Sequence, residues 1–514
     1  MDEGRAGQLA RAAGVVMVAF VASRALGLAR EMIISSQFGT SWELDAYLAA
    51  FRVPDLIFQI IARGALGSAF IPVFTEYLAR GEKEEAWRLA SAIFNIVFIA
   101  VTMASLLAAI FAPQLVAQVV APGFGPREQA LTTSLMRLML LSSVIFGMSG
   151  IAMGILNSFQ HFLWPAWAPA IYNLSIIGGA LFLAPTMGVY GLAIGVVVGS
   201  GLHFLIQVPE LVKRGLSYFP ILDLGHPGVR EVGRLVLPRM LGLATMQINF
   251  LVNTILASGL VAGSLAALNY AWLLMFLPLG VFAMAIATVA FPTFSELTAK
   301  GELSDLRRAL SLTLRVTWYL TVPATVGLFL LREPIIRLLL ERGRFGLEST
   351  GAVAWALQFY ALGLFAYATV EIVTRAFYAL HDTLTPVLVG LATMVLNIVL
   401  CLLLVGTLTH GGLALANSLA TMVEMVWLLF ILRGRMKGMG GRELLTSLLK
   451  ITAAAALMGM AVAWFAGATR TSPVLLQAVG AMVLGGGVYF LASLILGARE
   501  VKVVRELVGK RREV

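Results

Sequence analysis

Charged residues and cysteine are both scarce in this chain. Of its 514 residues, 12% are Asp, Glu, Lys or Arg and 59% are hydrophobic. That ratio leaves too little polar surface for a soluble protein of this length. The single cysteine, Cys401, lies in an apolar run. It excludes an internal disulfide and a cysteine metal site, and we interpret it as a small core residue.

Sequence motifs of catalysis and of nucleotide binding are also missing. The five histidines form no His-Glu-x-x-His pair, and neither a Gly-x-Ser-x-Gly elbow nor a Gly-x-x-x-x-Gly-Lys-Ser/Thr loop occurs. The sequence therefore predicts no catalytic residue, no bound nucleotide and no cofactor. An intramembrane enzyme remains the alternative of a different class.

What the chain has instead is a series of long apolar runs. Each is about 20 residues or more, which is enough to cross roughly 30 Å of hydrocarbon. The runs are apolar throughout rather than alternating, which indicates helices and not barrel strands. The sequence predicts an all-α integral membrane protein with no soluble domain. We expect about fourteen transmembrane helices, with ends uncertain by a few residues, over roughly 12–37, 43–78, 84–112, 128–156, 163–184, 187–212, 231–260, 263–298, 307–331, 347–379, 384–406, 411–433, 443–466 and 473–497.

The formal charge of +10 is concentrated in alternate connections between these runs. Basic residues gather before the first run, in the connections after the second, sixth, eighth and twelfth runs, and in the tail 499–514. The connections on the other side have few, apart from 332–344. Because cytoplasmic loops are rich in Lys and Arg, both termini are expected in the cytoplasm. This basicity indicates topology and contact with anionic lipid, and nucleic acid is not expected as a partner.

The two halves of the chain resemble each other in an ordered series of short matches. Arg24-Ala-Leu-Gly-Leu-Ala recurs from Arg239, Pro72 with Glu76 recurs as Pro292 with Glu296, and Phe124-Gly125 recurs as Phe345-Gly346. The offset covers six expected helices, so the repeats are parallel. We expect an N-lobe (1–220), a C-lobe (221–438) with a central cavity, an appended helix pair (439–498) and a basic tail (499–514).

Ionisable residues inside the expected spans are the candidate functional residues, because burying a charge there costs about 2.5–3.5 kcal/mol. The first span carries Arg24, Arg30 and Glu31. The second carries a polar stripe at intervals of 7, 7 and 4, formed by Asp45, Arg52, Gln59 and Arg63. With Arg239 of the second half, these residues predict a hydrated, cationic, substrate-binding cavity.

Structural roles for the same residues stay open. Arg30 and Arg63 could snorkel to an interface, and Arg30 with Glu31 could pair with neighbouring helices. Asp45 could cap a helix or serve as the counter-ion of Arg52, and Arg239 could anchor its helix. Asn253, Asn397 and Asn417 are weak candidates for a sodium site, since such amides more often bond across helix interfaces.

Several motifs together resemble one family, the MurJ (MviN) lipid II flippases of the multidrug/oligosaccharidyl-lipid/polysaccharide exporter superfamily. The resemblance runs along the whole chain and is most specific in its first 80 residues. It is carried by Ser23-Arg24-Ala-Leu-Gly27-Leu-Ala-Arg30-Glu31, Phe38-Gly39, Asp45-Ala46, Phe51-Arg52-Val-Pro54, Ala69-Phe70-Ile-Pro72-Val-Phe74, Ala121-Pro122-Gly123-Phe124 and Pro165-Ala-Trp-Ala-Pro169.

The resemblance implies a flippase that moves an undecaprenyl-diphosphate-linked peptidoglycan precursor, lipid II, across the bacterial cytoplasmic (inner) membrane by alternating access. It also implies that the last two helices form a groove for the lipid tail. Arg24, Arg30, Asp45 and Arg52 match by position, and Glu31 stands where the family usually has aspartate. We expect a monomer whose partners are lipid II and membrane lipids, driven by membrane potential or sodium.

Two positions depart from the family pattern. Phe58 and Leu273 stand where the family commonly has cavity arginines. The departure leaves the fold unaffected and bears on substrate choice. A flippase for another undecaprenyl-linked glycan is therefore the first alternative, ahead of a drug or cation antiporter, whose cationic substrates a cationic cavity would repel.

Overall fold

The structure is a computed structural model that describes residues 3–63 and 69–501. Side chains are described for all of these residues except 3–15, 61–63, 237–239 and 241–246. This part of the chain is helical and contains no strand. The expected all-α membrane fold class is confirmed.

Ten helices in the described residues are long and apolar enough to cross a membrane, and an eleventh span forms if a helix pair bent by 80° counts as one. The count of about fourteen is therefore not confirmed. The expected spans outside this set are 12–37, 43–78 and 231–260. These three carry Arg24, Arg52 and Arg239.

Chain contacts divide the molecule into two compact units. The first comprises Met1–Leu265 with Gly343–Phe345, and the second Ala266–Arg342 with Gly346–Val514. This division falls after the helix that follows residue 220, whereas the expected lobe boundary at 220 rests on the sequence repeat and stays a prediction.

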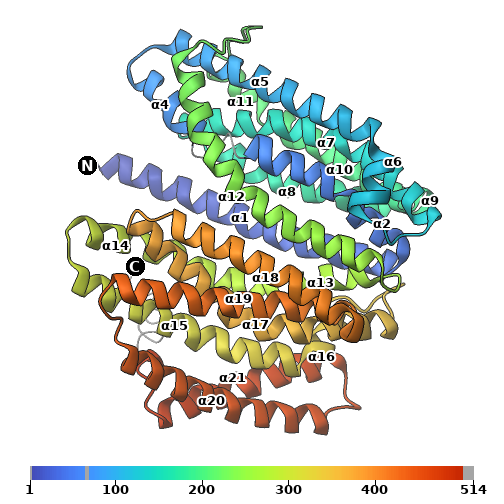
Figure 1. The fold of residues 1–514 in the computed structure, drawn as a ribbon, viewed down its shortest axis with the longest axis vertical. Coiled ribbons are helices and arrows are strands. Elements are labelled where there is room, and N and C mark those ends of the chain that lie inside the picture. The colour runs from blue at the N-terminus through green and yellow to red at the C-terminus, as the bar shows by residue number, and fades with distance from the viewer. Residues whose placement is uncertain (1–2, 64–68, 502–514) are drawn as a thin grey trace. The chain divides into compact units, whose positions relative to one another are not determined.

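Unit 1 is built around the long helices α1, α5, α7, α8 and α10 (Figure 1). Helix α1 packs against α8, α10 packs against α7 and α8, and α5 packs against α7. Its elements are α1 (Glu3–Phe38), α2 (Trp42–Ala50), α3 (Arg52–Ile57), η1 (Phe58–Arg63), α4 (Ile71–Ala79), α5 (Lys83–Ile110), α6 (Ala112–Leu115), η3 (Val116–Val120), α7 (Pro126–Ser158), α8 (Leu163–Gly178), η4 (Gly179–Leu183), α9 (Ala184–Met187), α10 (Val189–Leu205), α11 (Val208–Lys213) and α12 (Pro227–Ser258).

The second expected span is not one continuous α-helix. Its described residues, 42–63 and 69–79, include α2, α3, the π-helical η1 and α4. Phe51 separates α2 from α3, and Pro54 lies within α3, where it removes a backbone donor. A π-helical turn also changes the number of residues per turn. The polar stripe read at a 3.6-residue period is therefore interrupted between Arg52 and Arg63, and the prediction of a single helical face is corrected.

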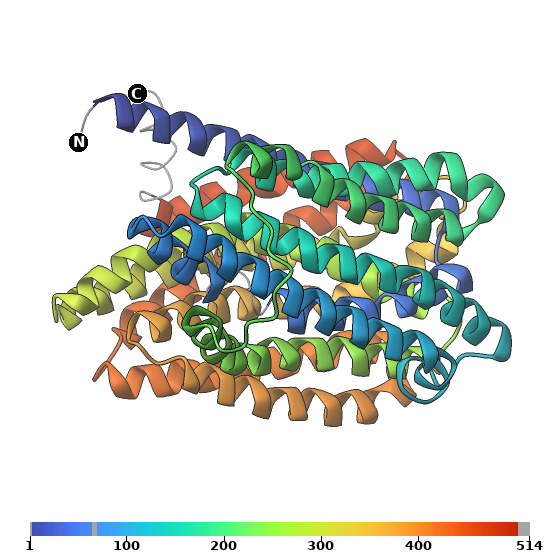
Figure 2. The same cartoon turned by 90° about the horizontal axis from the view of Figure 1, so that it is seen from above.

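The connection between α11 and α12 is an extended segment that runs across α5 (Figure 2). The Asn95 Nδ2 donates hydrogen bonds to the carbonyl oxygens of Phe219 and Ile221, at 3.2 and 2.8 Å. The Tyr218 hydroxyl donates to Asn95 Oδ1 at 2.8 Å. One buried asparagine thus satisfies the backbone of a segment that has no secondary structure of its own.

Unit 2 is centred on α17, which packs against α15 and α19, while α20 packs against α15 and α21. The Tyr489 hydroxyl of α21 donates to the Tyr319 carbonyl of α15 at 2.8 Å. Helices α20 and α21 form a hairpin beside α15 (Figure 1). Its elements are α13 (Ser264–Pro278), η5 (Leu279–Met284), α14 (Ala285–Ala299), α15 (Leu303–Leu330), α16 (Arg332–Leu339), α17 (Leu347–Ala379), α18 (Leu384–Leu408), α19 (His410–Arg435), α20 (Gly441–Ala468), η6 (Leu476–Gly480) and α21 (Ala481–Ile495).

The sequence repeat recurs in the lengths and ends of corresponding helices. Helices α5 and α15 both have 28 residues, and α7 and α17 both have 33. The two π-helices η1 and η5 have six residues each. Gly81 and Gly301, which precede α5 and α15, take φ values of 80° and 73°. The repeat therefore specifies local backbone geometry as well as residue type.

Candidate functional site

Arg30 is held in a defined orientation between α1 and α8. Its Nε and Nη2 donate to Glu31 Oε1 at 3.1 and 2.6 Å, and its Nη1 donates to Asn173 Oδ1 at 3.0 Å. Asn173 in turn donates to the Ser23 carbonyl at 3.2 Å. The side chains of Arg30 and Glu31 are 26% and 12% exposed. A partly buried guanidinium with a carboxylate and an amide partner is compensated and preorganised.

Arg24 lies on the same helix and is exposed. Its guanidinium carbon sits 5.2 Å from the centroid of the Phe20 ring, one turn earlier. Among the described residues no carboxylate forms an ion pair with Arg24. An exposed guanidinium without a carboxylate partner retains its donors for an anionic ligand.

Arg52 faces α12. Its Nε donates to the Thr254 hydroxyl at 2.7 Å, and its guanidinium carbon lies 5.6 Å from the centroid of the Phe250 ring. Thr254 is fully buried, so this contact joins the start of α3 to the interior of α12.

Asp45 is buried at a backbone turn. It is 3% exposed, and its Oδ2 accepts the backbone N–H of Gly263 at 2.6 Å. Gly263 has a φ of 90°, and a side chain there would overlap the Thr40 carbonyl. Asp45 thus stabilises a left-handed backbone conformation at Gly263, and only a residue without a Cβ fits at that position.

The side chains of Arg63 and Arg239 lie outside the described residues. Of the expected stripe, Gln59 forms a hydrogen bond within its own segment: its Nε2 in η1 donates to Asp55 Oδ1 in α3, at 3.4 Å. The structure therefore brings together Arg30, Glu31 and Asn173, and separately Arg52 and Thr254.

The amides considered for sodium have other partners within their own units. Asn397 is buried and its Oδ1 lies 3.7 Å from the Cys401 Sγ, while the Tyr367 hydroxyl donates to Asn417 Oδ1. Asn253 belongs to unit 1 and is 8% exposed. No group of three or more His, Cys, Asp or Glu in the described chain could hold a metal. Cys401 is buried and forms no disulfide, as predicted.

One feature of the structure was not predicted from the sequence. Two turns at equivalent positions of the repeat pack on two helix ends that are also at equivalent positions. The Gly123 N–H donates to the Ser258 hydroxyl at 3.0 Å, and a Cβ at Gly123 would lie 2.5 Å from the Gly259 Cα. Correspondingly, the Arg344 N–H donates to the Ser36 carbonyl at 2.7 Å.

The second of these turns is equally tight. Gly343 has a φ of 58°, and a Cβ there would overlap the Ser36 carbonyl oxygen. The first turn closes on the end of α12, and the second closes on the end of α1, so both contacts lie within unit 1. The glycines in the sequence could have predicted the turns. Their contact partners lie over 130 residues away and could not be predicted from the sequence.

The family model for the lipid II flippase MurJ matches residues 34–484 of this chain. The lipid II flippase MurJ of Burkholderia cenocepacia is 31% identical over 421 residues, covering 80% of this chain and 81% of the relative. This chain belongs to the MurJ family. The family recognised from sequence is thereby confirmed.

Other MurJ comparisons extend over nearly the whole chain. A probable lipid II flippase MurJ of Rhizobium meliloti is 29% identical, covering 96% of this chain and 95% of the relative. A solved structure of lipid II flippase MurJ in an inward closed conformation is 27% identical, with a TM-score of 0.81, and covers 96% of this chain and 99% of that one. The expected membership of a membrane transporter family is confirmed.

A more distant likeness shows the fold alone. An inward-facing multidrug resistance MATE family transporter of the MOP superfamily is 16% identical, with a TM-score of 0.68, covering 81% of this chain and 94% of that one. The superfamily fold predicted with the MurJ resemblance is therefore present.

The two departures from the MurJ pattern lie among aromatic rings. The Phe58 ring centroid is 5.3 Å from that of Phe146, which also contacts Tyr172 at 5.0 Å. Leu273 is half-buried and follows Trp272, whose ring contacts Tyr360 at 5.4 Å. The two sites where the family commonly carries a cation are here adjacent to apolar clusters.

Proposed function

We propose that this chain translocates lipid II, the undecaprenyl-diphosphate-linked peptidoglycan precursor, across the bacterial inner membrane. The observation that carries the proposal is the arginine pair on α1. Arg24 is exposed and lacks a described carboxylate partner, while Arg30 is fixed by Glu31 and Asn173. Family membership supplies the substrate class.

The chemistry of this pair suits a diphosphate. A guanidinium presents a planar fork of donors that matches phosphate oxygens and stays charged at all physiological pH values. Arg24 supplies an unpaired fork, and Arg30 supplies a preorganised charge six residues later, which is about 9 Å along the helix. The polyprenyl tail can remain in lipid while the charged head group crosses along this surface.

Residues Arg52 and Asp45 are proposed to act at the end of the pathway. Arg52 bridges α3 to Thr254, and Asp45 holds the Gly263 turn. Together with the two glycine turns at Ser36 and Ser258, they close one end of unit 1. We propose that these contacts separate and re-form during alternating access. Arg63 and Arg239 remain proposed members of the substrate-binding set.

Transport is proposed to use the membrane potential. A potential difference acts on each translocated charge with about 2.3 kcal/mol per 100 mV. Sodium coupling through Asn253, Asn397 and Asn417 is the alternative, and it would have to rely on amide oxygens without a carboxylate. We further propose that the protein works as a monomer with both termini in the cytoplasm, and that it has no catalytic activity of its own.

Complementation tests the proposal. A bacterium depleted of its own lipid II flippase should grow when this chain is expressed and should lyse without it. Failure to complement, despite membrane insertion and a normal thermal unfolding profile, would assign the chain to another lipid-linked glycan. Depletion of a flippase for such a glycan is the matched control strain.

A further inference from the structure

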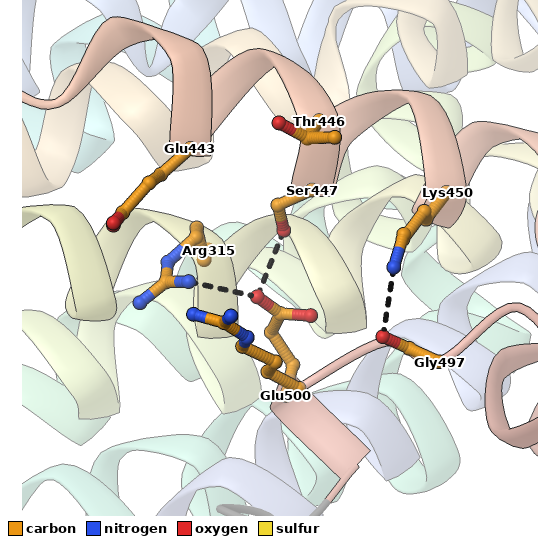
Figure 3. Close-up of a pocket in the computed structure, with 8 residues that line it drawn as sticks. Arg315, Glu443, Thr446, Ser447, Lys450, Gly497 and Glu500 are labelled. Carbon is orange, nitrogen blue, oxygen red and sulfur yellow. Dashed lines mark hydrogen bonds and ion pairs between the residues drawn. The ribbon is translucent and has the colours of Figure 1, made fainter.

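Unit 2 contains a cavity of about 190 Å³ at one end of its helix hairpin (Figure 3). Three chain segments surround it: α15, the first turns of α20, and the segment that follows α21. Polar and charged side chains dominate its wall. The lining residues are Arg315, Glu443, Thr446, Ser447, Lys450, Gly497, Arg499 and Glu500.

The buried carboxylate of Glu500, which has partners within the protein, forms the floor of the cavity. Glu500 is 2% exposed, and its Oε1 accepts a hydrogen bond from the Ser447 hydroxyl at 2.8 Å. The Arg315 Nη1 lies 3.6 Å from the same oxygen. Because the Arg315 charge offsets that of Glu500 and Ser447 satisfies one of its lone pairs, Glu500 does not prevent an anion from binding to the other cations of the cavity.

Donors for such an anion remain around the cavity. The Lys450 Nζ donates to the Gly497 carbonyl at 3.0 Å, which leaves two of its three N–H groups. Arg499 lines the cavity and is exposed. Arg315 uses one terminal nitrogen toward Glu500 and keeps the other.

The opposite end of the cavity carries a negative charge. Glu443 is exposed, and among the described residues its carboxylate forms neither a hydrogen bond nor an ion pair. Glu443 and Lys450 lie at opposite sides of the drawn cluster (Figure 3). The cavity is therefore complementary to a ligand with an anionic and a cationic group a few bonds apart.

Apolar side chains next to the cavity indicate that the ligand is a membrane lipid. Leu445 and Leu449 on α20 are 59% and 61% exposed, and Leu494 and Ile495 on α21 are 50% and 85% exposed. Such residues on spanning helices face hydrocarbon. The charged cavity thus lies where the hydrocarbon ends and lipid head groups begin.

We propose that this cavity binds the head group of phosphatidylethanolamine. The phosphate would accept hydrogen bonds from Lys450, Arg499 and Arg315, and the primary ammonium would donate to Glu443. Phosphatidylglycerol offers no cation to Glu443. Phosphatidylcholine carries the same positive charge but no N–H donors, so it can attract Glu443 by charge and cannot donate a hydrogen bond to it.

Native mass spectrometry of the full-length protein in detergent tests this site. Phosphatidylethanolamine, phosphatidylcholine and phosphatidylglycerol are added separately at matched concentrations. Phosphatidylethanolamine adducts should exceed phosphatidylcholine adducts on the order of fivefold, the ratio given by one net hydrogen bond. Glu443→Gln should remove this preference, and Lys450→Gln should weaken binding of all three lipids.

Glu302→Gln is the matched control, because Glu302 is an exposed glutamate of unit 2 outside the cavity. It should leave the preference unchanged. Glu443 is exposed and unpaired, so its variant should keep the thermal unfolding temperature of the parent. Equal retention of phosphatidylethanolamine and phosphatidylcholine by the parent, or an unchanged preference in Glu443→Gln, would overturn the proposal.

Discussion

Arg24 and Arg30 illustrate how two similar residues on one helix differ in environment. Arg30 has three hydrogen bonds to Glu31 and Asn173, whereas Arg24 contacts the Phe20 ring. A residue whose donors are unused is the better candidate for direct contact with a moving substrate. A residue with fixed partners is the better candidate for shaping the electrostatic field.

Substitution of Arg24 is the first test at this scale. Arg24→Ala should reduce lipid II flipping by tenfold or more, on the order of one charge-assisted hydrogen-bond pair, as measured by accessibility of labelled lipid II in vesicles. Arg24→Lys should retain part of the activity if charge suffices and little if phosphate needs the planar fork.

Arg80→Ala is the control for general effects of removing an exposed arginine, because Arg80 pairs with Glu76 at a helix end. It should flip lipid II normally. Normal flipping by Arg24→Ala as well would make Arg24 a structural residue and would remove the main support for a cationic pathway.

The sequence sufficed to select Arg24, Arg30, Glu31 and Arg52, because an ionisable residue in an apolar run is costly wherever the run is buried. Their partners could not be selected in the same way. Asn173 lies 143 residues from Arg30, and Thr254 lies 202 residues from Arg52. Only tertiary packing brings them together, and an asparagine or threonine in a membrane helix is otherwise unremarkable in a sequence.

At the scale of elements, two glycine turns pack tightly on helix ends within unit 1. Gly343→Ala places a methyl group against the Ser36 carbonyl and forces a left-handed φ on alanine. That conformation alone costs about 1–2 kcal/mol. We expect a lower thermal unfolding temperature together with reduced flipping.

Gly346→Ala provides the matched control three residues later. A Cβ at Gly346 meets no atom within 4 Å, and its φ is −94°. It should retain parental stability and flipping. Equal behaviour of the two alanine variants would contradict a tight closure at Ser36.

A second element-scale test concerns the turn between α17 and α18. Asp382 accepts the N–H groups of Leu384 and Thr385 at 3.1 and 3.0 Å and lies 2.6 Å from the Arg435 Nη1. Burial alone would raise the pKa of Asp382, but hydrogen bonds from Thr385 and Leu384 and the Arg435 charge together hold this pKa below its ordinary value.

A lowered folded-state pKa means that Asp382 stabilises the fold above its unfolded pKa of about 3.9, and that this contribution is lost as the pH falls further toward the folded value. The parent should therefore be more stable than Asp382→Asn at pH 7. Thermal unfolding of both proteins between pH 7 and pH 3 should show the difference shrinking below about pH 4. A difference that stays constant with pH would exclude the ionised carboxylate as its source.

Helix positions followed from apolar periodicity, whereas the division of residues 42–79 did not. The expected stripe from Asp45 to Arg63 extended one helical period across Phe51, Pro54 and a π-helical segment. Proline signals a possible break in a sequence, but the local change in residues per turn depends on which neighbours satisfy the freed carbonyls. The corresponding π-helix η5 follows Pro278.

At the scale of the whole molecule, the distribution of Lys and Arg predicts topology. In a Cys401→Ala background, Cys substitutions of Glu85 and Val508 should react with impermeant reagents only from the cytoplasmic side, and a Cys substitution of Thr186 only from outside. Cys401 itself is buried, so its removal should not perturb labelling. One residue reacting from the opposite side would break the expected alternation of helices.

The energy source also belongs to the whole molecule. Flipping in vesicles should respond to an imposed membrane potential and should be indifferent to replacing sodium by potassium. Asn397→Ala should not alter this behaviour, since the Asn397 Oδ1 lies beside the Cys401 Sγ. Sodium-dependent flipping that disappears in Asn397→Ala would instead place an ion site in unit 2.

The segment that crosses α5 tethers the start of α12 to α5. Residues 217–221 are fastened to Ser91 and Asn95, so only residues 222–226 are left to span the distance to α12. Five extended residues reach at most about 18 Å. His226 also lies 3.4 Å from Glu85. With its first turn tied to α5, α12 cannot shift as a whole, and any opening at its Ser258 end has to come from pivoting about this tether or from bending along its length.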